Sequence, residues 1–253
     1  LIHNVYEGNI DEYLDPKFGV LEYLLEQQKA GRIVHLGFSC HGALDVLKRF
    51  MESPFGEPME FCQLQLNYMD WHFQRCDEKA AYCEEIGLPV IVMEPMRGGK
   101  LATIDEEMAM QLDALRPGES PAGWAFRFIQ SLSNMFVTLT GASNMEQFKE
   151  NVALWEEEKP LTSDEFDTLV NLMDFENSKA GVPCTSCNYC KTHCPQGIPI
   201  PELIGMYNEH RSTKEGMGFM APMFVGSLEE GKRPEACTAC GSCEKVCTPQ
   251  LKI

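Results

Sequence analysis

Eight of the twelve cysteines lie in two short runs near the end of the chain, and these runs constrain the fold more than any other feature. The first run, CTSCNYCKTHCP, spans residues 184–195 and has the spacing C-x₂-C-x₂-C-x₃-C-P. The second, CTACGSCEKVCTP, spans residues 237–249 and repeats this spacing with one extra residue before the proline. Thiols spaced this closely are typical of a metal centre. We therefore expect residues 181–253 to form a small domain that folds around metal.

The spacing favours iron–sulfur clusters over structural zinc, which is the alternative. Zinc sites usually combine two separated pairs of ligands. A triplet followed by a fourth cysteine and a proline is instead the run that binds [4Fe–4S] clusters in bacterial two-cluster ferredoxins, where the fourth cysteine serves the other cluster. The sequence thus predicts two [4Fe–4S] clusters, one held by Cys184, Cys187, Cys190 and Cys247 and the other by Cys237, Cys240, Cys243 and Cys194.

Composition narrows the compartment and the partners. The other four cysteines (Cys40, Cys62, Cys76 and Cys83) are scattered through apolar or helical segments, unlike a secreted disulfide framework, so we expect a reducing, cytoplasmic location. The net charge of −17 would repel nucleic acid, and no apolar run approaches the ~20 residues needed to span a bilayer. A redox partner protein, if there is one, should present a basic face.

Residues 1–180 alternate apolar strand segments with helical segments. We expect strands at 1–3, 32–39, 60–67, 88–95 and 135–141, and helices at 15–31, 42–53, 75–87, 121–132, 143–155 and 162–173. Two further helices are expected between the cysteine runs, at 200–211 and 221–231. The alternation predicts an α/β fold with a parallel sheet covered by helices. The segment 1–3 is shorter than the usual ~5–6 residues, so we expect the strand to begin upstream, in a longer protein.

Local signals refine this prediction. Ser143 with Glu146, and Thr162 with Glu165, have the spacing of capping boxes. In the strand at 60–67, alternation places Cys62, Leu64 and Leu66 on one face and Phe61, Gln63 and Gln65 on the other. The apolar face should meet the helices, which leaves two glutamines on the inner face, where they need polar partners.

Five segments of residues 1–155 resemble the aldo-keto reductases in order and spacing: LIHN, GRIVHLGFS, CQLQLNYMD, GLPVIVMEPMRGGKLA and TGASNMEQFKEN. That family consists of NAD(P)H-dependent (β/α)₈ barrels that act on small carbonyl or alcohol substrates. The resemblance implies that residues 1–180 form a partial TIM barrel, strands four to eight, followed by a ferredoxin-like iron–sulfur domain at 181–253.

The same resemblance implies roles for individual residues. His3 matches the active-site histidine that orients the substrate carbonyl. Ser39 and Gln63 match the pair that binds the nicotinamide carboxamide, and Met93 stands where many members place an aromatic ring against the nicotinamide.

A second set of residues would bind the other end of the dinucleotide. Gly141, Ala142, Ser143 and Asn144 lead into a helix whose N-terminus suits a phosphate group. Glu150 and Asn151 match the adenine-contacting pair. Because Gln147 occupies the position of the usual arginine, the choice between NAD and NADP stays open.

Two hypotheses for the function of the protein fit these sequence features. The first is an NAD(P)H-dependent oxidoreductase of the aldo-keto reductase type, coupled to [4Fe–4S] electron transfer. The alternative is an electron-transfer protein whose barrel is a non-catalytic docking scaffold. The family's catalytic tyrosine, lysine and aspartate belong to the first three βα units, which have no counterpart here, so we expect these 253 residues not to transfer hydride by themselves. The clusters could also serve only to hold their domain together.

Overall fold

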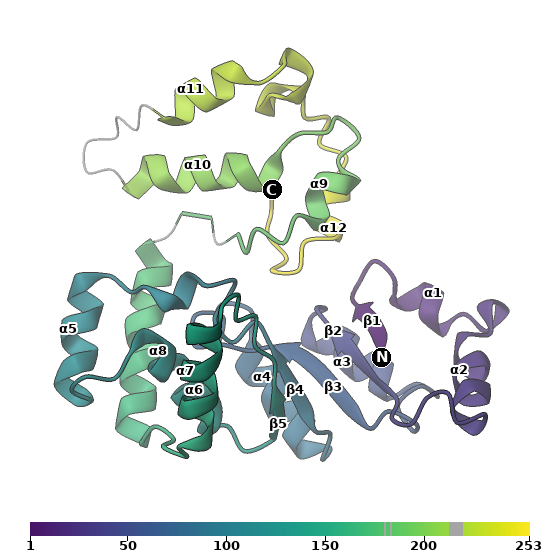
Figure 1. Cartoon of the computed structure of the whole chain (residues 1–253). Coiled ribbons are helices and arrows are strands. Elements are labelled where there is room, and N and C mark those ends of the chain that lie inside the picture. Colours follow the sequence, from purple (N-terminus) through teal and green to yellow (C-terminus); the bar gives the residue numbers. More distant parts are fainter. Residues whose placement is uncertain (180, 183, 213–219) are drawn as a thin grey trace. The chain divides into compact units, whose positions relative to one another are not determined.

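The computed structural model describes residues 1–179, 181, 182, 184–212 and 220–253 (Figure 1). They form two compact units. The first comprises Leu1–Val5 and Asn9–Asp174, and the second comprises Tyr6–Gly8 and Phe175–Ile253. No helix in the described part of the chain is both long enough and apolar enough to cross a membrane.

A five-stranded parallel sheet forms the centre of the first unit. Its strands follow their order along the chain: β1 (Ile2–Val5), β2 (Gly37–Cys40), β3 (Phe61–Gln65), β4 (Val90–Met93) and β5 (Met135–Thr138). Sequential parallel neighbours joined by helical segments are successive βα units. The predicted α/β fold class is confirmed. Strands β2 to β5 are shorter than the apolar runs that predicted them, whereas β1, with four residues, is longer than the predicted 1–3.

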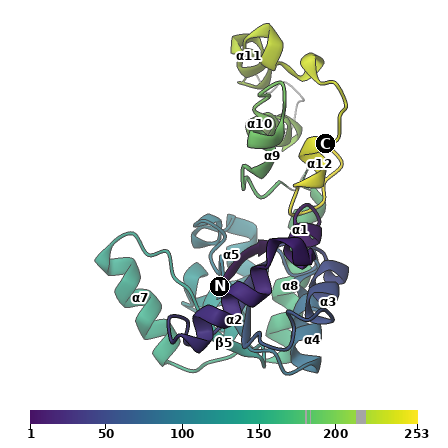
Figure 2. The same cartoon turned by 90° about the vertical axis from the view of Figure 1, so that its right-hand side faces the viewer.

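The two faces of the sheet differ in burial. Cys62 and Leu64 on β3 are buried, whereas Gln63 between them is only half-buried. Helix α3 (Leu44–Met51) packs on the buried face, where the ring of Phe50 lies 4.5 Å from that of Phe38 on β2. Helix α4 (Cys76–Glu85) contributes further buried side chains to the same core. Figure 2 shows α3 and α4 on one side of the sheet. The prediction for the two faces of β3 is confirmed.

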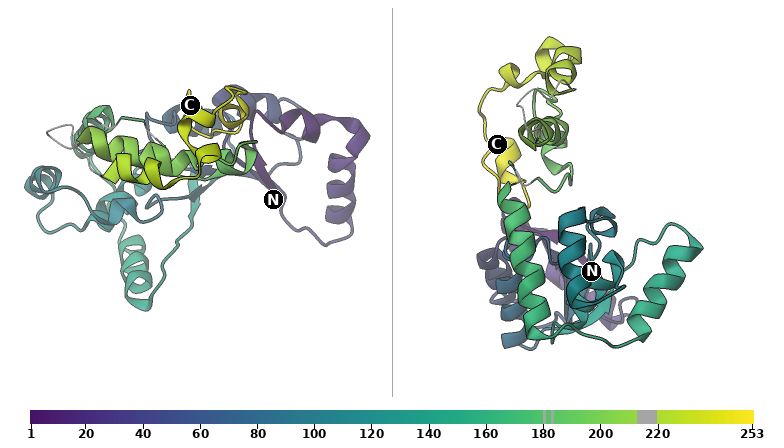
Figure 3. Two further views of the ribbon diagram at one scale, coloured as in Figure 1. Left: turned by 90° about the horizontal axis from the view of Figure 1, so that it is seen from above. Right: turned by 90° about the vertical axis from the view of Figure 1, so that its left-hand side faces the viewer.

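The helix predicted at 15–31 is interrupted. Asp15 accepts a hydrogen bond from the backbone of Lys17 at 3.0 Å and starts a short 3-10 turn, Pro16–Phe18. Gly19 then adopts a φ of 60°, so that helix α2 runs only over Val20–Lys29. Helix α1 (Ile10–Leu14) precedes this segment. Neither α2 nor α7 (Met145–Glu156), which stand at opposite ends of the sheet in Figure 3, carries a buried residue.

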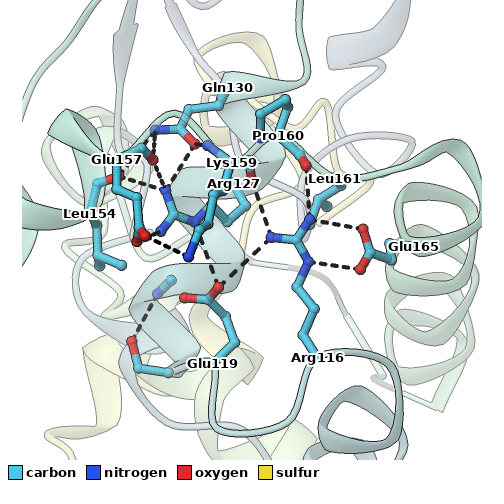
Figure 4. A network of polar contacts seen from close by, with 12 residues as sticks. Arg116, Glu119, Arg127, Gln130, Leu154, Glu157, Lys159, Pro160, Leu161 and Glu165 are labelled. Atoms are coloured by element: carbon cyan, nitrogen blue, oxygen red, sulfur yellow. Dashed lines mark hydrogen bonds and ion pairs between the residues drawn. The ribbon is translucent and has the colours of Figure 1, made fainter.

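Arg127 joins three segments at the far end of the sheet. It lies on helix α6 (Pro121–Gln130) and is only 1% exposed. Its guanidinium donates to the carbonyl of Leu154 at 2.7 Å, to Gln130 Oε1 at 3.1 Å and to the carbonyl of Glu157. It also forms ion pairs with the carboxylates of Glu157 at 2.9 Å and Glu119 at 3.6 Å (Figure 4). The buried charge thus fixes the end of α7 against α6.

Arg116 secures the segment that follows. It ends helix α5 (Glu106–Leu115), and its guanidinium donates to both carboxylate oxygens of Glu165, at 2.7 and 2.9 Å. It also donates to the carbonyls of Lys159 and Pro160, at 3.1 and 2.8 Å (Figure 4). Glu165 in turn accepts a bond from the backbone of Thr162 at 2.8 Å at the start of helix α8 (Ser163–Lys179). The capping box predicted there is confirmed.

The second unit has little regular structure and a small core. Its helices are α9 (Tyr189–His193), α10 (Ile200–Ser212), α11 (Met220–Ser227) and α12 (Ser242–Lys245), with 3-10 turns at Glu230–Lys232 and Pro234–Ala236. In the described part of this unit, one apolar cluster is built on the buried residues Cys190, Ile198, Ile200 and Val246. The two helices predicted between the cysteine runs are confirmed. So small a core gives little stability by itself, which fits a domain stabilised by bound metal.

Candidate functional site

The inner face of the sheet brings together three of the predicted cofactor residues. Ser39 on β2 and Ile91 on β4 are the register partners of Gln63 on β3, so the three side chains share a face. Gln63 Nε2 lies 3.3 Å from the sulfur of Met93. Ser39 is buried, and its hydroxyl accepts a hydrogen bond of 2.7 Å from the backbone of Asn4. The half-buried amide of Gln63 is therefore held beside a soft thioether.

His3 and its surroundings lie at the edge of the sheet. Its side chain is exposed on β1, where the pairing with β2 shifts register and Asn4 has a φ of 56°. The Tyr13 hydroxyl donates to the carbonyl of His3 at 2.9 Å. His41, directly after β2, is a residue that sequence reasoning missed. Burial first, and then the charges of Lys79 and His3, lower the pKa of His41 to about 4, so this imidazole is neutral near pH 7.

A buried polar network lies at the carboxyl ends of β3 and β4. The fully buried carboxylate of Asp70 accepts hydrogen bonds from Gln65 at 2.7 Å and from Asn67 at 2.9 Å. Asn67 also donates to the carbonyl of Glu94 at 3.0 Å. Arg97 Nε lies 3.1 Å from Asp70, which ties the loop after β4 to the loop after β3. Parallel barrels place their sites at this end of the strands.

The N-terminus of α7 differs by one residue from the prediction. Asn144, not Ser143, is the N-cap, and its Oδ1 accepts a bond of 2.9 Å from the backbone of Gln147. The Gln147 side chain accepts a bond of 2.9 Å from the backbone of Ser143. The capping box predicted between Ser143 and Glu146 is therefore wrong. Asn144 has extended backbone angles, so the first helical residue is Met145 and the N-cap moves by one position.

The two residues matched to adenine binding hold α7 in place. Glu150 accepts a hydrogen bond of 3.1 Å from the hydroxyl of Ser120. Asn151 donates to Thr140 Oγ1 at 2.7 Å, and the backbone of Ala142 also contacts that oxygen at 3.3 Å. The segment 140–142 is thus connected to the helix that follows it, while Glu150 stays exposed and Asn151 is half-buried.

The two cysteine runs fold in the same way. The backbone N–H of Ser186 donates to Cys184 Sγ at 3.3 Å, and that of Ala239 donates to Cys237 Sγ at 3.4 Å. Ser186 and Ala239 have φ values of 56° and 52°. Two residues later Asn188 and Gly241 have φ values of 66° and 69°, immediately before α9 and α12. Left-handed backbone turns the N–H groups toward sulfur, as metal-binding thiolates require.

Each of two cavities in the second unit is lined by four cysteines. A narrow one is lined by Cys184, Cys187, Cys190 and Cys247. A larger one, of about 500 Å³, is lined by Cys194, Cys237, Cys240 and Cys243. Each cavity therefore combines three cysteines of one run with the last cysteine of the other, which are the same two sets as the crossed assignment. The sulfurs surround these spaces without converging: in the described part of the chain, no group of three His, Cys, Asp or Glu residues could hold a single metal ion.

The two buried thiols, Cys190 and Cys247, both line the narrow cavity, and a nearby cation would favour their ionised form. Burial raises the pKa of Cys190 to about 12 and that of Cys247 to about 11. Without a metal both would be protonated near neutral pH, whereas coordinated thiols are deprotonated. Each of the twelve cysteines, all of which are described, is free of a disulfide. The chemistry of the donor set thus fits thiolate-bound metal.

The four scattered cysteines belong to the core of the first unit. Cys40, Cys62, Cys76 and Cys83 are all buried, and Cys76 Sγ donates to the carbonyl of Gln65 at 3.2 Å. Burial raises the pKa of Cys62 far above the ordinary value. Such thiols are inert packing groups.

Comparison with protein families gives two matches that cover most of the chain. The profile of the aldo/keto reductase family matches residues 4–174, and that of a 4Fe-4S dicluster domain matches residues 183–251. No curated protein sequence matches the chain.

Solved structures share the fold of the first unit. The holo form of aldo-keto reductase AKR11C1 from Bacillus halodurans is 22% identical, with a TM-score of 0.51, over 68% of this chain and 60% of that one. An aldo/keto reductase from Klebsiella pneumoniae in complex with NADP and acetate is 16% identical, with a TM-score of 0.52, over 68% and 56%. A Klebsiella pneumoniae aldo-keto reductase in complex with NADPH is 17% identical, with a TM-score of 0.51, over 61% and 53%. The chain thus spans between about half and three fifths of their lengths.

Proposed function

The chain belongs to the aldo/keto reductase family and carries a 4Fe-4S dicluster domain, and on this premise we propose that the protein is an NAD(P)H-dependent oxidoreductase whose nicotinamide chemistry is coupled to [4Fe–4S] electron transfer. The proposal that the protein binds a nicotinamide rests on the position of Gln63. Its amide lies on the inner face of the sheet, beside Met93 and in register with buried Ser39. An inward amide beside an apolar thioether suits a planar ligand that carries a carboxamide.

The proposed roles divide between the two ends of the dinucleotide. Gln63 and Ser39 would bind the carboxamide, and Met93 would cover one face of the ring. The phosphates would lie near the N-terminus of α7, where backbone N–H groups and the helix dipole favour an anion. When bound, the nicotinamide supplies the hydride for a small carbonyl or alcohol substrate. The choice between NAD and NADP depends on position 147, where Gln147 replaces the arginine that is usual in the family.

His3 would orient the substrate carbonyl. Its side chain is exposed on β1 in the described part of the chain. The resemblance implies that proton transfer needs a tyrosine, a lysine and an aspartate, and none of residues 1–253 is their counterpart. We therefore propose that these residues bind and orient but do not complete hydride transfer by themselves. The substrate would be a small carbonyl compound or the matching alcohol.

For the second unit we propose two [4Fe–4S] clusters with crossed ligands, one in each cysteine-lined cavity. Backbone N–H groups donating to Cys184 and Cys237 would stabilise the thiolates. A hydride carries two electrons and each cluster accepts one, so a pair of clusters suits exchange with a nicotinamide. A redox partner protein would then supply or remove the single electrons.

The nicotinamide assignment is tested by fluorescence titration of the full-length protein with NADH and NADPH. Gln63→Ala should weaken binding by about 1–3 kcal/mol, because the carboxamide would lose a buried partner. His3→Ala should leave affinity unchanged and lower turnover. Gln111→Ala, at an exposed position on α5, is the matched control and should change neither. Loss of binding in His3→Ala with normal binding in Gln63→Ala would reverse the roles.

A second candidate is an electron-transfer protein with a non-catalytic barrel. In its favour, all eight predicted cluster ligands lie within this chain. Under this alternative the full-length protein would bind neither nucleotide, while its clusters would still be reduced reversibly. That pair of results would decide against the reductase.

A further inference from the structure

The second cysteine run departs from the first at two residues that carry a hydroxyl group, Thr248 and Ser242. Thr248 is the extra residue between Cys247 and the proline of the second run, a position that the first run lacks. Ser242 precedes the third cysteine of the second run, where the first run has Tyr189. Both residues therefore place a short aliphatic hydroxyl close to the backbone of a segment that otherwise repeats its conformation.

Each of these hydroxyls contacts a cysteine, and the two cysteines are equivalent. Thr248 Oγ1 lies 3.7 Å from Cys187 Sγ, which is 61 residues away in the other run. Ser242 Oγ lies 3.4 Å from Cys240 Sγ. Cys187 and Cys240 are the second cysteines of their runs, and both are exposed. The same ligand position thus receives a hydroxyl in both sites, by two different routes through the chain.

The contacts follow the crossed grouping of the cysteines. Thr248 belongs to the second run but contacts Cys187, a member of the narrow cavity. Ser242 contacts Cys240, a member of the larger cavity. Each hydroxyl thus lies within reach of a sulfur in a different one of the two cysteine-lined cavities.

A thiolate has no proton, so a hydroxyl beside a cluster-bound sulfur must be the donor. Hydrogen bonds to the ligand sulfurs are among the factors that set the potential of a cluster, together with its net charge and its exposure. Reduction adds one negative charge to the cluster and its thiolates. A donor to sulfur stabilises this charge and raises the reduction potential. Removing the donor should lower the potential without removing a ligand.

We propose that Thr248 and Ser242 are potential-setting residues, each acting on a different cluster: Thr248 on the one bound by Cys187 and Ser242 on the one bound by Cys240. The inference rests on the proposed presence of two [4Fe–4S] clusters. Because the two donors come from unrelated positions, either potential can change in evolution independently of the other. Two clusters of different potential could pass single electrons in one direction.

The test is an anaerobic redox titration of the reconstituted full-length protein, with dithionite as reductant and electron paramagnetic resonance as the readout. Thr248→Val should lower the midpoint potential of one cluster signal and leave the other unchanged. Ser242→Ala should lower the potential of the other signal, and the double variant should show both shifts. Thr248→Ser, which keeps a hydroxyl, should stay close to the unaltered protein.

Thr192→Val is the matched control, because the Thr192 hydroxyl donates to the carbonyl of Tyr189 at 3.1 Å. It should shift neither potential. Iron content is measured first for every variant, and Thr248→Ala replaces the valine variant if that one loads poorly. If the fully loaded Thr248 and Ser242 variants both give two signals with unchanged midpoint potentials, the inference is overturned, whereas the proposal of two clusters is not. Shifts of the same signal by both variants would also overturn it. A protein that binds no iron would overturn the inference and the proposed clusters together.

Discussion

Replacing Arg127 should destabilise the first unit more than any exposed ion pair could. Arg127→Met keeps most of the side-chain volume and removes the guanidinium. Its donors to the carbonyls of Leu154 and Glu157 would be lost, together with the ion pairs to Glu157 and Glu119. The α7–α8 connection would then no longer be fixed to α6.

The expected magnitude follows from burial. Arg127 is 1% exposed, and removing one partner of a buried pair costs about 3–5 kcal/mol. The Glu157 carboxylate is 53% exposed, so that ion pair is screened and contributes little. The carbonyl oxygens of Leu154 and Glu157 keep Gln130 Nε2 as a donor, at 3.1 and 3.4 Å. Most of the loss therefore comes from the hydrogen bonds of the charged guanidinium itself, since such bonds contribute about 1.5–3 kcal/mol each. We therefore expect a loss of about 3 kcal/mol.

Urea unfolding followed by tryptophan fluorescence measures this loss. All three tryptophans (Trp71, Trp124 and Trp155) lie in residues 1–174, so the signal reports the first unit. The matched control is Arg75→Met, because Arg75 forms its ion pair with Glu78 at the surface, with 67% of the arginine side chain exposed. It should cost less than about 1 kcal/mol. Equal, small losses in both variants would refute the role given to Arg127.

Three further outcomes follow from buried groups of the first unit. Asp70→Asn should cost about 3–5 kcal/mol in the same urea assay, because it leaves the charge of Arg97 at the strand ends without its partner; a loss below 1 kcal/mol would contradict this. Phe50→Ala should cost about 3–5 kcal/mol through an unfilled cavity, since Phe50 is fully buried; a near-normal unfolding midpoint would contradict this. Arg116 lowers the pKa of Glu165 from 4.5 to about 2, so the stability from this pair is present above pH 4.5 and lost as the pH falls toward 2. Glu165→Gln should therefore flatten the fall in stability between pH 5 and 2, and an unchanged slope would count against the pair.

The fold was predictable from the sequence where one local pattern dominates. The apolar runs at 60–67 and 88–95 became β3 and β4, and alternation correctly assigned the faces of β3. Helix α5 was missed, although Asp105 signals it: its carboxylate accepts a bond of 2.9 Å from the backbone of Met108. The same segment also has Met108, Leu112 and Leu115 at helical spacing and acidic residues in its first turn, so the sequence did contain the signals of this helix.

Errors arose where two local signals competed. At 15–31 the proline and the spacing of apolar residues favour one helix, but Gly19 takes a left-handed conformation and divides it. Phe18 and Leu25, which a single helix would place on one face, are both exposed. At the start of α7, Ser143 and Asn144 are both good N-caps, and only backbone angles decide between them.

The polar networks could not have been predicted. Arg127 and Asp70 are among the residue types that are rarely buried, and their partners lie in segments that only the fold brings together. The cysteine sites are the opposite case. The spacing of the cysteines indicates which of them belong to each ligand set, so the sequence was enough to propose which cysteines share a cavity. The hydroxyls of Thr248 and Ser242 became visible only once distances between the two runs were known.

The most direct test of the central claim is iron and acid-labile sulfide content, measured together with electron paramagnetic resonance, in the reconstituted protein and three cysteine variants. Two clusters require about eight irons per chain. Cys194→Ser and Cys243→Ser should lose the same cluster signal, because both cysteines line the larger cavity, whereas Cys190→Ser should lose the other. Stoichiometric zinc without iron would contradict the clusters. Loss of one common signal in Cys194→Ser and Cys190→Ser, with that signal retained in Cys243→Ser, would contradict the crossed ligation.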